Sequence, residues 1–293
     1  MNPPEEQPLE DSKIEETKKV LSKVNVQAQP KVLLELNRLA KSEDVSFDLI
    51  SDLVAQDVGL SAKVLKLASS PIYSKGQTFS SVNEALMAIG FAEFRACFTL
   101  VGLHELLGKI GYPYKGFWEH SKQVSLYCRE LAEKFASRLS SNAYTLGLFH
   151  DVGAVLIPLH DRQYIEHIHR ALPLYFGITE LEFRVVKTNH CAVGEMYTQS
   201  WGLSHDILMA LRYHHRSDMD SSWSEDTKTL KAILQLAELI NDKIVTGSDT
   251  IAPFSGSKDT LANICMLFDL KADDIHLLEK DLLVAARDKN RTF

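Results

Sequence analysis

The sequence lacks the features of a secreted, zinc-ribbon or disordered protein. Its 293 residues include four cysteines, at positions 97, 128, 191 and 265, and no CxxC pair. This excludes a disulfide scaffold or a zinc ribbon and suits a reducing compartment. Glycine and proline number only 14 and 9, which excludes a linker-rich chain. The N-terminus is acidic rather than a basic, apolar secretion signal, and no apolar run reaches the ~18 residues of a membrane span. We therefore expect a cytoplasmic protein that does not enter the membrane.

Positive charge is also in short supply. The chain has 32 lysines and arginines against 39 aspartates and glutamates, which gives a net charge of −7. Non-specific nucleic-acid binding depends on basic side chains that neutralise phosphates, so nucleic acid is not an expected partner. The 45% of hydrophobic and 24% of charged residues are the mixture of an ordinary globular protein.

Helical periodicity, by contrast, runs through almost the whole chain. Apolar residues recur at spacings of three and four, as in the segment 32–40, which is the pattern of one helix face. Ser81 and Glu84 form a capping-box pattern before a short helix that ends at Gly90. Further helices are expected at residues 48–55, 61–68, 92–107, 117–138, 142–157, 161–172, 178–188, 191–200, 204–215, 228–246, 258–268 and 271–288. Because no useful alternating strand pattern is present, the predicted fold class is all-α.

A set of histidines and carboxylates is the most informative feature of the sequence. His120 and His150 fall on the apolar, core-facing sides of their predicted helices, and Asp151 follows His150 directly. Imidazole and carboxylate groups are ligands of divalent transition metals, and two such ions can activate water for phosphoester hydrolysis. The candidate ligands of such a cleft are His120, His150, Asp151, His190, His214, His215 and Glu238, with Asp242, one turn after Glu238, as a substitute. Cys191 is an alternative ligand, although a free cysteine is more often a small buried apolar residue.

The order of these residues resembles the HD superfamily, a group of all-helical, metal-dependent phosphohydrolases named after an adjacent His-Asp pair. Here the pair His150-Asp151 stands in LGLFHDVGAVL, close to the HDIGK-type helix of the superfamily. The resemblance implies a multi-helical HD-like bundle that holds one or two divalent ions, iron or manganese. It also implies that Asp151 is the catalytic residue if the protein is an active hydrolase.

Further segments resemble the HDOD domain, the HD-related output domain. In chain order the matching segments are DLVAQDVGLSAKVLKLASSP (52–71), SVNEALMAIG (81–90), FWEHS (117–121), HCAVG (190–194) and WGL (201–203). The resemblance covers residues from about 20 to 217 and implies bacterial signal transduction. It implies a regulatory or protein-interaction role, because catalysis is not generally established for HDOD domains.

The resemblance and the helical pattern together predict a domain organisation. We expect a disordered tail at 1–12, an HDOD domain at 13–217 and a C-terminal helical extension at 218–293. Within the HDOD domain, an N-terminal helical half spans 13–110 and an HD-like half spans 111–217.

Four departures from the family patterns bear on catalysis. Ala154 replaces a lysine that often follows HDIG in active HD enzymes, and Ser69 replaces an asparagine. Glu238 takes the position of the aspartate that comes last in the HD superfamily pattern, and its side chain is one methylene longer. The GYP motif of the cyclic di-GMP phosphodiesterase branch is absent after His215. These departures favour a regulatory protein that binds a signalling protein or a small ligand without catalysis. The alternatives are a metal-dependent phosphohydrolase acting on a nucleotide or phosphodiester, and a purely structural histidine network.

Overall fold

The computed structural model describes most of the chain, and every statement below concerns those residues. They are residues 7–23, 35, 38–39, 46–55, 58–69, 74, 77–108, 115–161, 164, 178–199, 203–247 and 257–290. These residues form helices and connecting turns and include no β-strand, so the predicted all-α class is confirmed. The helices are α1 (Gln7–Lys23), α3 (Phe47–Ala55), α4 (Val58–Ala68), α6 (Val82–Gly108), α7 (Lys115–Phe135), the 3₁₀ turn η2 (Ser137–Leu139), α8 (Ser140–Phe149), α9 (Val152–His160), α11 (Ile178–Val186), α12 (His190–Gln199), α13 (His205–Tyr213), α14 (Glu225–Thr246), α15 (Ser257–Phe268) and α16 (Ala272–Asn290).

The helices divide into two compact units, each of which we describe by itself. The first unit contains α1, α7 to α9, α11 to α15 and most of α16. The second contains α3, α4 and α6. The helices predicted as a C-terminal extension therefore pack in the same unit as the HD-like helices.

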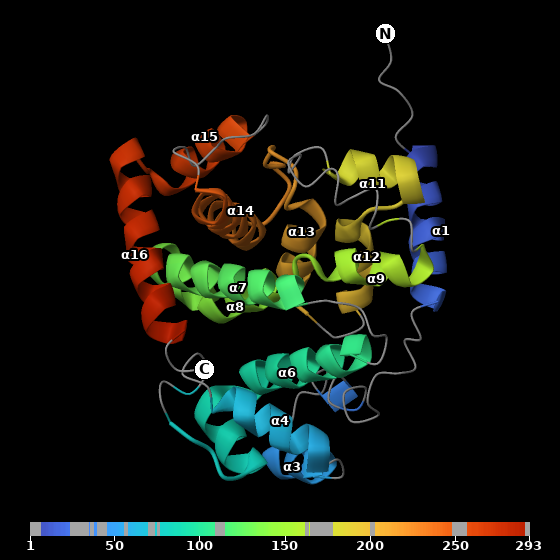
Figure 1. The fold of residues 1–293 in the computed structure, drawn as a ribbon, viewed down its shortest axis with the longest axis vertical. Coiled ribbons are helices and arrows are strands. Elements are labelled where there is room, and N and C mark those ends of the chain that lie inside the picture. Colours follow the sequence, from blue (N-terminus) through green and yellow to red (C-terminus); the bar gives the residue numbers. More distant parts are fainter. Residues whose placement is uncertain are drawn as a thin grey trace. The chain divides into compact units, whose positions relative to one another are not determined.

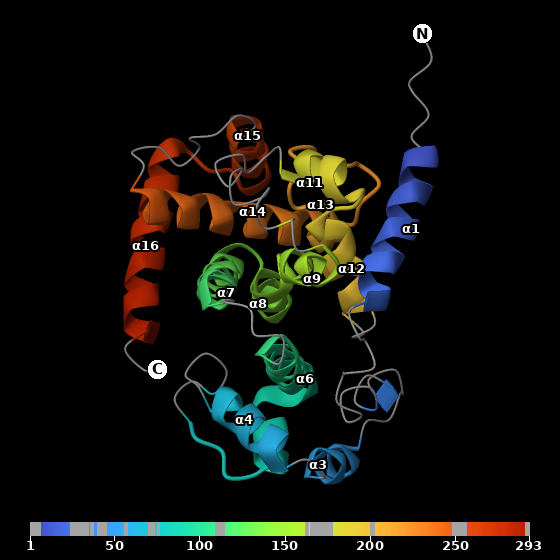
Figure 2. The same ribbon diagram turned by 45° about the vertical axis from the view of Figure 1, so that its right-hand side comes forward.

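In the first unit, a row of helices supports a long crossing helix. Figure 2 shows α7, α8 and α9 nearly end-on, with α14 running across them. Helix α12 packs against α9 and α13, and α1 lies beside both α9 and α12 (Figure 1). Most side chains at the centre of α14 are buried, from Leu230 to Asn241. This arrangement brings residues from five helices toward the middle of α14.

In the second unit, α3 and α4 pack on α6. Its core is apolar and includes the fully buried Val64, Leu86, Phe94 and Phe98. Helix α6 breaks at Gly90, whose φ of 82° and ψ of 164° are not helical and which favour glycine. The break falls where the sequence predicts a helix end.

The predicted capping box at the start of α6 is present, except that the Glu84 carboxylate bonds the backbone N–H of Ser80 instead of that of Ser81. The Glu84 backbone N–H donates to Ser81 Oγ at 3.1 Å. The Glu84 carboxylate accepts in return from the Ser80 backbone N–H at 2.8 Å, so the reciprocal pair satisfies two helix-end donors.

Three predicted boundaries differ from the structure. The helix expected at 142–157 is two helices that break at His150 and Asp151, and α9 continues past Pro158. The last turn of α9 closes because the Asp161 N–H donates to the Ile157 carbonyl at 3.0 Å. Residues 7–12, expected in a disordered tail, belong to α1, a helix held by the buried Thr17 and Val20. The helices expected at 32–40 and 161–172 lie largely outside the described residues.

Candidate metal centre

Two glycines allow the helices of the HD-like region to approach one another closely. A Cβ atom on Gly153 would lie 2.0 Å from the carbonyl oxygen of His190, and one on Gly147 would lie 2.7 Å from the Cα of Ser125. Both distances are far below van der Waals contact. Glycine at 153 therefore lets α9 touch the first turn of α12, where His190 lies.

The predicted ligands come from several helices and lie close together. His120 lies in α7, and Glu238 lies in the middle of α14. The break between α8 and α9 presents His150 and Asp151 in succession. His190 is the first residue of α12, and His214 and His215 directly follow α13.

Asp151 occupies the centre of this cluster and faces two groups of histidines. Its Oδ2 atom lies 3.2 Å from His150 Nε2 and 3.7 Å from His120 Nε2. Its Oδ1 atom lies 3.4 Å from His190 Nε2 and 3.7 Å from His214 Nε2. Asp151 thus presents one carboxylate oxygen to each group of histidines, and it could contribute to either group if metal ions were bound.

Glu238 and His215 complete the two sides. Glu238 Oε1 lies 3.3 Å from His150 Nε2, and His215 Nε2 lies 3.0 Å from His190 Nε2. Among the described residues, the groups whose donor atoms lie within 4.8 Å of one another include Glu238 but not Asp242. Glu238, and not Asp242, therefore lies among the grouped donor atoms.

The far ring nitrogens of the histidines are held by hydrogen-bond partners. Nδ1 of His150 donates to the Gly147 carbonyl at 2.8 Å, and Nδ1 of His214 donates to the Leu211 carbonyl at 2.7 Å. A proton fixed on Nδ1 leaves the lone pair of Nε2 available for a metal. The amide nitrogen of Asn241 lies 3.3 Å from His120 Nδ1.

His190 has the most elaborate support. Its Nδ1 lies 2.8 Å from a carboxylate oxygen of Glu182, and its backbone N–H donates to the same carboxylate at 3.0 Å. The Tyr164 hydroxyl donates to Glu182 in turn. A carboxylate behind a histidine fixes the ring and raises its basicity as a ligand, so this chain of contacts is of the kind that orients metal-binding histidines.

Electrostatics divide the cluster into groups that favour and oppose positive charge. Burial opposes charge on His150, but the carboxylates of Asp151 and Glu238 outweigh it and raise the pKa of the imidazole. Burial and the neighbouring charges of His214 and His190 instead lower the pKa of His215 well below its usual value. The clustered imidazoles therefore differ in how strongly their surroundings favour the protonated form.

Two further groups show that carboxylates and histidines act on different sides of the cluster. Burial, followed by the charges of Glu238 and Asp151, raises the pKa of Asp242 to about 7. The pKa of Cys191 falls to about 7, because His190 and His214 outweigh the effect of burial.

The donor set fits one or two divalent transition-metal ions. Five imidazoles and two carboxylates line the two sides of the cluster, and hydrogen-bond partners lie beside the Nδ1 atoms of His120, His150, His190 and His214. Most of the cluster is buried, but the Asp151 and His120 side chains remain 26% and 30% exposed. One edge of the centre therefore reaches the protein surface.

Some supporting residues carry no signal in the sequence. Gln235 donates to the carbonyls of His214 and Arg216 at 2.7 Å each, and Lys231 donates to the Arg216 carbonyl at 2.7 Å. Glu182 and Asn241 also act on the cluster only through a neighbour. These side chains belong to helices with ordinary patterns, so only their position in the fold identifies them.

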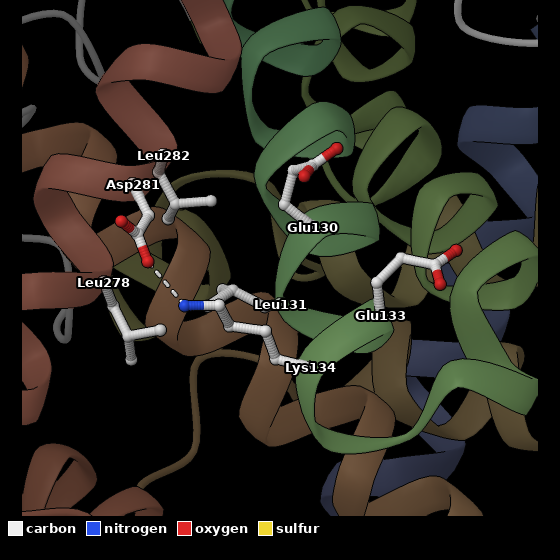
Figure 3. A pocket seen from close by; sticks show the side chains of 7 residues that line it. All are labelled: Glu130, Leu131, Glu133, Lys134, Leu278, Asp281 and Leu282. Atoms are coloured by element: carbon white, nitrogen blue, oxygen red, sulfur yellow. Dashed lines mark hydrogen bonds and ion pairs between the residues drawn. The ribbon is translucent and has the colours of Figure 1, made fainter. Parts of the chain in front are cut away.

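A separate shallow pocket lies between α7 and α16 in the first unit. Figure 3 shows Leu131, Leu278 and Leu282 lining it, with an ion pair between Lys134 and Asp281 at 2.5 Å on its edge. None of the clustered histidines lines it, so it is not part of the candidate metal centre.

Comparisons with known proteins identify the class of this fold and site. The sequence model of the HDOD domain matches residues 26–217, and the chain belongs to the HDOD domain family. The match ends at His214-His215-Arg216-Ser217, before the helix that supplies Glu238.

The chain is similar to several individual proteins. An uncharacterized protein of Treponema pallidum (strain Nichols) is 25% identical over 196 residues, which are 64% of this chain and 37% of that protein. An HDOD domain protein of unknown function from Geobacter sulfurreducens superimposes with a TM-score of 0.68 at 22% identity, covering 95% of this chain and 96% of that one. A protein of Shewanella amazonensis SB2B, provisionally named a phosphohydrolase, superimposes with a TM-score of 0.65 at 23% identity, covering 90% and 93%. At these identities the two structures establish the fold. Within the described part of the chain, no helix has the length and apolar character to span a bilayer.

Proposed function

We propose that this HDOD protein is a bacterial signalling protein whose HD-like unit binds divalent transition-metal ions, and that it regulates a partner protein or responds to a small ligand. The observation that carries the metal centre is the convergence of histidine Nε2 atoms on both oxygens of Asp151, at 3.2 to 3.7 Å. Iron and manganese suit a set of imidazoles and carboxylates.

The outer contacts support a retained metal centre rather than a chance cluster. A structural network would gain nothing from leaving five Nε2 atoms facing one another, because neutral imidazoles can donate only one hydrogen bond each. The Nδ1 atoms of His150, His190 and His214 each have an acceptor of their own. A metal-binding histidine requires this arrangement, in which Nδ1 donates to an acceptor and Nε2 stays available for the metal.

The segment that contains His150 and Asp151 also favours regulation without catalysis. Ala154 occupies the position where the resemblance to active HD enzymes places a lysine, and its methyl group offers no charge to a phosphate. The family membership supports a signalling role, and the four free thiols suit the cytoplasm.

Metal-dependent hydrolysis of a phosphoester is the second candidate, and one observation favours it. Asp151 and His120 are partly exposed, so a phosphate oxygen has a route to the edge of the centre. In that case the clustered residues would hold the ions, which supply activation of water when bound. The Shewanella protein with the same fold, provisionally named a phosphohydrolase, is consistent with this candidate.

A calorimetric titration tests the proposal. Mn²⁺ is added to the chelator-treated full chain, to the His150→Ala, Asp151→Ala double variant and to His276→Ala. His276 is a matched control because it is a histidine with a side chain 62% exposed, far along the chain from the cluster. We expect the full chain and His276→Ala to bind one or two equivalents, and the double variant to lose that binding.

Equal binding by all three proteins would contradict the proposal. The hydrolase candidate is tested separately with the metal-loaded chain and a generic phosphodiester. Turnover that disappears in the double variant would establish hydrolysis, and its absence beside intact metal binding would favour regulation.

A further inference from the structure

Cys191 is the one thiol of the chain that lies within the histidine cluster. Its Sγ atom lies 3.4 Å from His190 Nε2 and 3.7 Å from His214 Nδ1. One donor atom from each of His190, Cys191, His214 and His215 lies within 4.8 Å of the others. Cys191, His190 and His214 are all buried.

The separations of the other donors from His190 Nε2 are close to those that a single ion would impose. Bond lengths of about 2.0 to 2.1 Å to nitrogen and about 2.3 Å to sulfur, at tetrahedral angles, put two nitrogens about 3.3 Å apart and a nitrogen and a sulfur about 3.5 Å apart. The observed separations from His190 Nε2 are 3.0 Å to His215 Nε2, 3.4 Å to His214 Nε2 and 3.4 Å to Cys191 Sγ.

The opposite side of Asp151 has a different character. There the donors that group together are His120, His150 and Glu238, two nitrogens and a carboxylate. Thiolates select thiophilic ions such as Zn²⁺ or Fe²⁺, whereas carboxylate and imidazole sets also suit Mn²⁺. The two sides of the cluster therefore offer different chemistry.

We propose that Cys191 is a thiolate ligand, and that it makes the side of the centre formed by His190, His214 and His215 selective for a thiophilic divalent ion. The inference rests on the proposed metal centre and deepens it. On binding, the ion forms a bond to Sγ and the thiol proton is released to the buffer. The other half of the centre keeps a thiol-free ligand set, so two sites of unequal preference share Asp151.

Cobalt(II) is the probe, because a cobalt–thiolate bond produces an intense near-ultraviolet charge-transfer band in addition to the weaker visible bands of any bound cobalt. The chelator-treated full chain is titrated with Co²⁺ beside Cys191→Ser and Cys265→Ser. Cys265 is the control because it is the least buried of the four thiols and reports adventitious binding.

We expect the charge-transfer band to grow with the first equivalent in the full chain and in Cys265→Ser, and to be absent in Cys191→Ser. The first equivalent should also bind at least about tenfold more weakly in Cys191→Ser, since loss of even an outer partner costs that much. Zn²⁺ should abolish the band at lower concentration than Mn²⁺.

The outcomes separate the two proposals. Visible cobalt bands without a charge-transfer band in the full chain would overturn the thiolate assignment and leave the metal centre standing. A band that persists in Cys191→Ser would overturn it as well. Failure of the full chain to bind cobalt at all would overturn both. If circular dichroism shows that Cys191→Ser does not fold, Cys191→Ala replaces it, and the absence of the band in the full chain still overturns the assignment by itself.

Discussion

The two units are both built from helices, but their cores bury different side chains. The described core of the second unit is almost entirely apolar, with residues such as Leu86, Phe94 and Phe98. The first unit has an apolar core too, but it also buries His150, Glu238 and further charged or polar groups. Burying such groups costs free energy unless they are paired.

The difference separates residues that hold the fold from residues that hold a site. Apolar packing between helices, as in the core of the second unit, is sufficient to stabilise a helical unit. The polar cluster of the first unit departs from this apolar packing, and such a local departure is expected at a functional site. Substitutions in the two cores should therefore have separable effects on stability and on metal binding.

The largest effect should come from Gly153→Ala. The new Cβ would lie 2.0 Å from the His190 carbonyl oxygen, a backbone atom that cannot move aside without shifting α9 or α12. We expect a loss of at least about 5 kcal/mol in the free energy of unfolding, or failure to fold. Gly116→Ala is the control, because nothing lies within 4 Å of a Cβ there, and it should change stability by no more than about 1 kcal/mol. Urea denaturation measures both. A mild effect at Gly153 would contradict the close approach of the two helices.

Phe94→Ala tests the apolar core of the second unit. Phe94 is fully buried in α6, and its truncation should cost about 3 to 5 kcal/mol. At a temperature where the variant remains folded, its affinity for Mn²⁺ should equal that of the unaltered chain. A changed affinity would show that the metal centre depends on the second core, and would break the comparison.

Glu182→Gln should have the opposite profile. The substitution keeps the shape of the side chain and an acceptor for His190 Nδ1, but removes the negative charge behind that ring. We expect Mn²⁺ affinity to fall by about 10- to 100-fold, with a small change in the melting temperature of the metal-free protein. Glu180→Gln, an exposed glutamate of the same helix, should bind as the unaltered chain does. Equal affinities in the two variants would remove Glu182 from the support of the centre.

Lys231 gives the smallest effect and a dependence on pH. Its burial lowers its pKa to about 8, against about 10.4 in an unfolded chain. Between these values the unfolded state binds more protons, so stability rises with pH. Relative to Lys231→Met, the unaltered chain should therefore gain about 2 kcal/mol between pH 7 and pH 10. Denaturation at several pH values measures this. A stability difference between the two proteins that does not change with pH would show that burial does not lower the pKa of the Lys231 amine.

The sequence was sufficient for the class of fold and for the residues of the cluster, because both depend on patterns along the chain. Helical periodicity predicts helices such as α3 and α13 within one or two residues. Ser204 caps α13 by accepting from the Ile207 N–H at 3.4 Å. The break at His150 and Asp151 was not predicted, because apolar spacing continues unchanged across it.

The supports of the cluster could not be predicted for a different reason. Glu182 precedes His190 by eight residues in another helix, and only the packing of α11 on α12 turns its carboxylate to Nδ1. The choice between Glu238 and Asp242 likewise depends on the rotation of α14 over α8, which one sequence does not specify.

Metal content tests the central claim most directly. The full chain and the His150→Ala, Asp151→Ala double variant are purified without chelator or metal-affinity resin, and their transition metals are measured by elemental analysis. The account predicts about one or two equivalents per full chain and none in the folded double variant. A folded full chain that carries no metal, and acquires none when Mn²⁺, Fe²⁺ or Zn²⁺ is supplied, would contradict it.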